Sequence, residues 1–146
     1  LAFDYIAQND PGCRTMKEPL ADTPDAPLAE FLEAACARHS TFAPEQVERL
    51  ARLYGNRLDD MLATACAELT PDLPAHLATQ TAYAVDQEMA VCLDDVVLRR
   101  LTEGQTGEID EAQIAAIAEY MSRRLNWSDA EKKRQIKTLK AGLHIA

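Results

Sequence analysis

Residues 80–101 constrain the fold more than any other part of this chain; they read QTAYAVDQEMAVCLDDVVLRRL. The segment is apolar nearly all the way round a helix, and charged residues are scattered through it. Burying a helix of this kind requires its charges to find partners. The pattern predicts one long central helix over about 77–101, about 37 Å long at 1.5 Å per residue.

The charged residues of this helix indicate ion pairs. Four residues share one stripe of the predicted helix: Glu88, Cys92, Asp95 and Arg99. Asp95 and Arg99 can pair directly, whereas Asp86 lies on a largely apolar face and needs a partner from another helix. An acid–base site in a cleft is the alternative, but no histidine accompanies these residues. We interpret them as a buried ion-pair network, in which replacing Arg99 by Ala costs roughly 3–5 kcal/mol.

Helical patterns also account for the first half of the chain. Residues 11–27 hold four prolines and predict an extended loop. Apolar stripes then predict helices over about 27–38 and 44–54, and Gly55 is typical of the cap that ends the second one. Asn56 is expected to cap the helix that follows.

The second half of the chain carries further start and stop signals. Gly104 and Gly107 are expected to end the long helix. Two capping-box patterns predict the starts of the last two helices: Asp110 with Gln113, and Ser128 with Glu131. No stretch alternates in a convincing strand pattern. The sequence therefore predicts an all-α fold, a bundle of five to six helices with one long central helix at about 77–101.

The charge of the chain narrows its partners. The net charge is −9, and residues 128–146 carry five basic against two acidic side chains, so the acidic excess lies in the rest of the chain. This acidic balance argues against nucleic acid as a partner, because phosphate binding needs a basic face. The basic end predicts the solvated face of a terminal helix, with anionic lipid or an acidic subunit as the alternative contact.

The sequence shows no metal motif, catalytic motif or membrane span. The four cysteines form no C-x-x-C pair and no histidine flanks them, which argues against zinc: Cys13, Cys36, Cys66 and Cys92. Residues 102–113 have the spacing of a calcium loop but lack its carboxylates. No apolar run approaches the roughly 20 residues that span a bilayer, and no signal peptide is present. We expect reduced thiols in a cytosolic protein.

Three patches of the sequence resemble a known family. The first is LARLYG at 50–55, the second is YAVDQEMA at 83–90 continuing to LDDVVLRR at 93–100, and the third is LNWS at 125–128. Upstream lies CRTMKEPL at 13–20. Together they resemble the C-terminal helical domain of FAD-dependent glycerol-3-phosphate dehydrogenases and oxidases.

The resemblance implies that the parent protein is an oxidoreductase of glycerol metabolism. In this family glycerol 3-phosphate is oxidised to dihydroxyacetone phosphate, and FAD passes the electrons to a quinone, or to oxygen in the oxidases. The flavin and substrate sites lie upstream, so we expect no catalytic, cofactor-binding or metal-binding residue in this chain and no activity from it alone. Residues 1–26 are expected to be the tail of the catalytic portion with a connecting loop, and residues 27–146 the C-terminal helical domain.

Partners and location follow from the same resemblance. The expected partner is the catalytic flavin domain of the same chain, with quinone or membrane contact through the parent, in the cytoplasm or peripheral on the inner membrane. Because the chain begins at Leu1 and not at Met, we expect a longer protein. An independent helical module that binds a partner protein through an apolar groove is the alternative. The sequence leaves open whether the parent protein is a dehydrogenase or an oxidase, what role this domain has, and which oligomer it forms.

Overall fold

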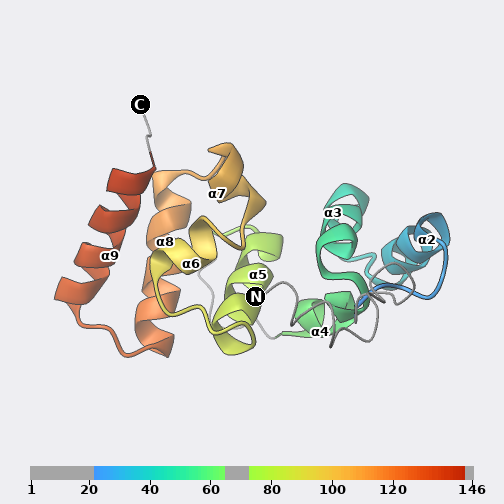
Figure 1. Cartoon of the computed structure of the whole chain (residues 1–146), viewed down its shortest axis with the longest axis horizontal. Helices are drawn as coiled ribbons and strands as arrows, with labels where there is room; N and C mark the ends of the chain where they lie inside the picture. The colour runs from blue at the N-terminus through green and yellow to red at the C-terminus, as the bar shows by residue number, and fades with distance from the viewer. Residues whose placement is uncertain (1–21, 65–72, 144–146) are drawn as a thin grey trace, which may run out of the picture. The chain divides into compact units, whose positions relative to one another are not determined.

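The described part of the chain, residues 22–64 and 73–143, is built of helices in the computed structural model (Figure 1). The predicted all-α fold is therefore confirmed. The chain divides into two compact units, Leu1–Arg57 and Leu58–Ala146. The boundary between residues 26 and 27 stays a prediction. The resemblance patch at 13–20 and Cys66 lie outside the described residues.

The first unit contains the two helices that the apolar stripes predict. They are α2 (Leu28–Arg38) and α3 (Pro44–Tyr54), followed by the 3-10 turn Gly55–Arg57. The two α-helices contact each other, and their stripes supply the buried residues of this unit: Phe31, Leu32, Ala35, Val47, Leu50 and Ala51. Burial of these apolar side chains is the main stabilising contribution that this unit shows.

Gly55 ends α3 as predicted, with a positive φ of 52°. A side chain would collide there, because an added Cβ would lie 2.1 Å from the carbonyl oxygen of Asp22. The prediction for Asn56 is wrong. Its side-chain amide donates a hydrogen bond to the carbonyl oxygen of Thr23 at 3.1 Å, so it fastens the segment before α2 instead of capping a helix.

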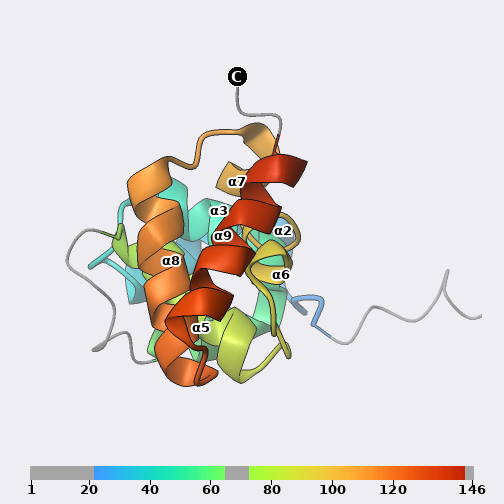
Figure 2. The ribbon, with the colours of Figure 1, turned by 90° about the vertical axis from the view of Figure 1, so that its left-hand side faces the viewer.

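The second unit is organised around one largely buried helix, α5. Its elements are α4 (Leu58–Ala63), α5 (Ala75–Asp86), α6 (Leu93–Val97), α7 (Thr102–Thr106), α8 (Glu111–Arg124) and α9 (Asp129–Gly142). In α5 every residue from 77 to 84 is buried. Helices α8 and α9 lie side by side (Figure 2), and α6 contacts both. The core includes these fully buried side chains: Leu77, Leu93, Ile117, Met121 and Leu139.

The single long helix predicted over 77–101 is wrong. Helix α5 ends at Asp86, residues 87–92 leave the helical path, and the short α6 follows. Because the predicted helix is split, the described residues contain more helices than the five to six that the sequence predicts. Apolar residues on all sides of a segment predict its burial, but several short helices inside a core bury such residues as well as one long helix does. The pattern therefore placed most apolar residues of the segment correctly in the core, Met89 and Val91 excepted, without giving the breaks between the helices.

Gly104 and Gly107 have different roles from those that the sequence suggests. Gly107 adopts a left-handed conformation, with φ 78°, and ends α7. Gly104 lies inside α7, where an added Cβ would lie 1.8 Å from the carbonyl oxygen of Val97. The missing side chain at Gly104 therefore allows α7 to approach the end of α6 closely.

The two predicted capping boxes differ in outcome. At the start of α8, Asp110 Oδ1 accepts a hydrogen bond from the backbone N–H of Gln113 at 2.8 Å, and Gln113 Oε1 accepts one from the N–H of Asp110 at 3.0 Å. This box is confirmed. At α9 only half forms, because Ser128 Oγ accepts from the N–H of Glu131 at 3.2 Å while the Glu131 carboxylate binds Arg134. A nearby guanidinium competes successfully for that carboxylate.

Candidate functional site

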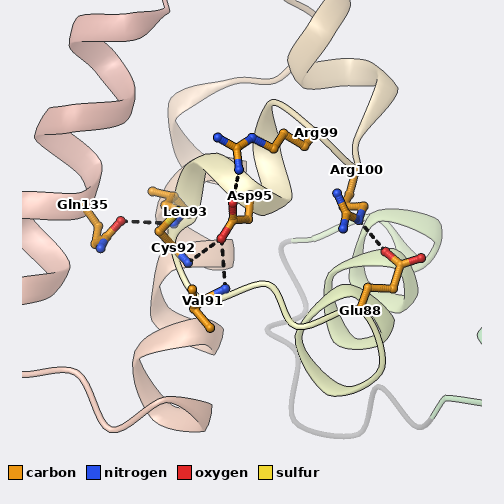
Figure 3. Close-up of polar contacts among 8 residues, drawn as sticks. All are labelled: Glu88, Val91, Cys92, Leu93, Asp95, Arg99, Arg100 and Gln135. Carbon is orange, nitrogen blue, oxygen red and sulfur yellow. Dashed lines mark hydrogen bonds and ion pairs between the residues drawn. The ribbon is translucent and has the colours of Figure 1, made fainter. Parts of the chain in front are cut away.

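The loop that joins α5 to α6, residues 87–92, gathers the charged residues that the sequence singles out; we call it the α5–α6 loop (Figure 3). Glu88 belongs to the loop itself, whereas Asp95 and Arg99 follow it. They do not share one helical stripe, because the helix breaks between them. The stripe predicted from their spacing is therefore wrong, although the pairing of Asp95 with Arg99 is confirmed.

Asp95 holds the end of the loop. Its Oδ2 accepts hydrogen bonds from the backbone N–H groups of Val91 and Cys92, each at 3.1 Å, and its Oδ1 accepts from Arg99 Nη1 at 2.6 Å. Burial alone would raise the pKa of Asp95, but the hydrogen bonds from Cys92 and Val91, with the charge of Arg99, hold it below its ordinary value. Asp95 is thus an ionised carboxylate in the first turn of α6 that forms a capping box with the N-cap residue Cys92.

Cys92 shows no sign of a reactive thiol. Burial, followed by its hydrogen bond with Asp95, raises the pKa of the Cys92 thiol. A raised pKa lowers the thiolate fraction at neutral pH, and the thiolate is the nucleophile. The cysteine beside Asp95 therefore favours a structural role.

Two further ion pairs flank the loop. Glu88 Oε2 accepts from Arg100 Nε at 2.6 Å, which closes the loop onto the turn after α6. Asp86, at the end of α5, pairs with Arg124 of α8 at 2.5 Å, so the predicted partner from another helix is confirmed. The buried network, however, is wrong, since the Arg99 side chain is 66% exposed and the Arg124 side chain 44%. Short apolar side chains face the core here, while the long arginines reach water.

Gln135 of α9 completes the cap of α6, and no pattern in the sequence predicted this contact. Its Oε1 accepts a hydrogen bond from the buried N–H of Leu93 at 3.1 Å, and its Nε2 donates to Glu131 Oε1 at 2.8 Å. The N–H groups of three successive residues at the start of α6 therefore have side-chain acceptors: Val91, Cys92 and Leu93. Because Leu93 and Gln135 are 42 residues apart, only the tertiary fold brings them together.

A second cluster also escaped the sequence patterns. His76 Nε2 of α5 lies 3.2 Å from Glu103 Oε1 of α7, and the two side chains are only 12% and 11% exposed. A histidine and a carboxylate at this distance can exchange a proton. A cavity of about 350 Å³ between α4 and α5 does not include them; its lining is Asp60, Ala63, Thr64, Tyr83 and Gln87. The pair therefore favours a structural tie between α5 and α7.

Metal and membrane chemistry find no support in the described ranges. Within residues 22–64 and 73–143, no three side chains of His, Cys, Asp or Glu are grouped so that they could hold a metal ion. In the same ranges, no helix combines the length and the apolar character needed to cross a bilayer. The charged side chains around the α5–α6 loop instead cap α6 and pair with each other.

Such an arrangement defines a helical domain, and comparison with known proteins gives its family. Residues 13–132 match the C-terminal domain of alpha-glycerophosphate oxidase, and the chain belongs to this family. The family resemblance seen in the sequence is therefore confirmed.

Full-length relatives are much longer than this chain. Proteins named glycerol-3-phosphate dehydrogenase 2, from Mycobacterium bovis and Mycobacterium tuberculosis, are each 31% identical to it over 101 residues. The match covers 64% of this chain but only 17% of the length of each relative. No solved structure gives a significant match.

Proposed function

We propose that this chain is the C-terminal domain of an FAD-dependent glycerol-3-phosphate dehydrogenase. The parent protein oxidises glycerol 3-phosphate to dihydroxyacetone phosphate and passes the electrons to a quinone, in the cytoplasm or peripheral on the inner membrane. The family match over residues 13–132 carries the proposal, and relatives named glycerol-3-phosphate dehydrogenase 2 support the choice of substrate.

FAD belongs, in this proposal, to the portion of the parent that precedes this domain. The residues of this chain do not fit a flavin nucleotide: a dinucleotide site places a glycine-rich turn between a strand and a helix, and residues 22–64 and 73–143 contain helices without a strand. We therefore assign no catalytic, cofactor-binding or metal-binding role to any residue here. Residues 1–26 connect the catalytic portion to the helical domain of residues 27–146.

The chemistry of the α5–α6 loop supports a packing role. Asp95 is ionised and fully engaged with two N–H groups and Arg99, so it is a poor proton acceptor at neutral pH. Glu88 is held by Arg100. Residues occupied in this way stabilise a surface and do not carry a reaction.

Turnover by the parent protein tests the proposal. We expect the purified longer protein to form dihydroxyacetone phosphate from glycerol 3-phosphate with a soluble quinone analogue as acceptor, and the 146-residue chain alone to form none. Glycerol, which lacks the phosphate, is the control substrate. Turnover that depends on oxygen and not on the quinone would assign an oxidase instead. A protein without either activity would contradict the proposal and favour the helical interaction module.

A further inference from the structure

Two apolar side chains stand out on the α5–α6 loop. Met89 is 85% exposed and Val91 is 63% exposed, while Ala90 between them is buried. Among the described residues of the second unit, they are the large apolar side chains that face water; the other two that the structure describes, Leu28 and Leu53, belong to the first unit. A packed helical unit that buries its other large apolar groups gains nothing from exposing these two.

The backbone of the loop holds this exposure in place. Ala90 donates its N–H to the carbonyl oxygen of Ala84 at 3.0 Å, so its methyl group turns inward and its neighbours turn outward. Met89 accordingly adopts a φ of +59°, a conformation that is unfavourable for a residue with a long side chain. Strain of this kind persists where the surrounding contacts enforce it, often at a functional surface.

Hydrogen bonds and ion pairs make the loop rigid. Asp95 accepts the N–H of Val91, and Arg100 holds Glu88, so both ends of the exposed pair are fixed (Figure 3). A loop that is already ordered loses little conformational entropy on binding. Arg99, which is well exposed, binds the same carboxylate that holds the N–H of Val91, so a charged group accompanies the apolar ones. An apolar centre with a polar rim is the usual anatomy of a protein–protein contact.

We propose that Met89 and Val91 anchor this domain on the catalytic portion of the same polypeptide. The inference rests on the proposed function. The family is one of C-terminal domains and the match covers 17% of each relative, so most of each relative lies outside the matched region, and a preceding catalytic portion is the occupant that we propose. The preceding portion is tethered to this domain at high effective concentration, which favours a small contact that would be weak between free molecules.

Thiol labelling of the longer protein tests the contact. The variant Met89→Cys places a reactive group at the proposed anchor, and Thr138→Cys is the matched control on an exposed position of α9. Each purified variant is treated with N-ethylmaleimide and digested, and labelling at each position is quantified by fragmentation in the mass spectrometer, which separates position 89 from the native Cys92 three residues away. We expect Met89→Cys to react at least about tenfold more slowly than Thr138→Cys in the native protein, and at the same rate in guanidinium. Equal rates in the native protein would overturn the proposal.

Two further readouts identify the occupant. Protection at Met89→Cys is expected to be unchanged on dilution of the protein; protection that disappears on dilution would assign the surface to a second copy and overturn the proposal. Flavin reduction by glycerol 3-phosphate is measured on the same samples. Reduction with equal labelling rates would leave the proposed function intact and remove only the docking contact, whereas protection in a protein without flavin would overturn the catalytic portion as occupant.

Discussion

Substitutions at Asp95 separate helix capping from ion pairing as the main role of this carboxylate. In Asp95→Ala, the N–H groups of Val91 and Cys92 lose their acceptor, and Arg99 loses its partner. Loss of an N-terminal cap costs about 1–2 kcal/mol, and the exposed Arg99 adds at most about 1 kcal/mol. We therefore expect Asp95→Ala to lower the free energy of unfolding by roughly 1–3 kcal/mol.

The matched variants divide this total. Arg99→Ala removes only the ion pair, and with a side chain 66% exposed it should cost less than about 1 kcal/mol. Asp95→Asn keeps one acceptor oxygen but loses the charge, so its cost should lie between the other two. The exposure of Arg99 therefore lowers the expected cost of Arg99→Ala below the value that a buried ion-pair network would give.

Urea unfolding followed by tryptophan fluorescence measures these free-energy costs in the second unit of the chain. Trp127 is the single tryptophan of the chain and packs against the core of the second unit. Its signal therefore reports on the unit that contains Asp95, and the midpoint shift at constant slope gives the change in free energy. An Arg99→Ala cost equal to that of Asp95→Ala would refute the capping account.

Three other outcomes follow from the structure. Gly104→Ala should cost roughly 1–3 kcal/mol by forcing α7 away from Val97, while Gly142→Ala, which meets open space, should be neutral or slightly stabilising in the same urea assay. Gln135→Ala should cost about 1–3 kcal/mol, since the buried N–H of Leu93 loses its acceptor; a cost below the error of the fit would contradict this cap. The folded pKa of Asp95 lies below its ordinary value of 3.8, so the stability advantage of the wild type over Asp95→Asn should be constant above about pH 5 and shrink as the pH falls through the lowered pKa. An advantage that grows with acidification, measured by unfolding at several pH values, would contradict the sign.

Local signals predicted the helix ends where one side chain decides them. Gly55 and the pair Asp110–Gln113 act within a few residues of their own position, so their spacing in the sequence carries the necessary information. The apolar stripes of α3 and α8 likewise identified buried faces. For these elements, the sequence predicted both the helix ends and the buried faces.

Contacts between residues far apart in the sequence could not be predicted from it. The break after α5 depends on Asp95 acting as a cap, yet its spacing to Arg99 equally fits a continuous helix. Gln135 reaches Leu93 across 42 residues, and His76 reaches Glu103 across 27. No periodic pattern encodes such pairs, because each partner also fits an ordinary helix surface.

The exposed pair on the α5–α6 loop was also hidden in the sequence. Within a predicted helix, Met89 and Val91 are simply two more apolar residues of a buried segment. Their exposure follows from the break in the helix and from the inward turn of Ala90. The surface that we propose for docking therefore became visible only once the path of the backbone was known.

The visible absorption spectrum of the purified longer protein tests the central claim most directly. The account predicts bound flavin whose absorption bleaches when glycerol 3-phosphate is added without oxygen, and which does not change when glycerol is added. A colourless protein, or flavin that glycerol 3-phosphate leaves oxidised, would contradict the assignment of this chain to a glycerol-3-phosphate dehydrogenase.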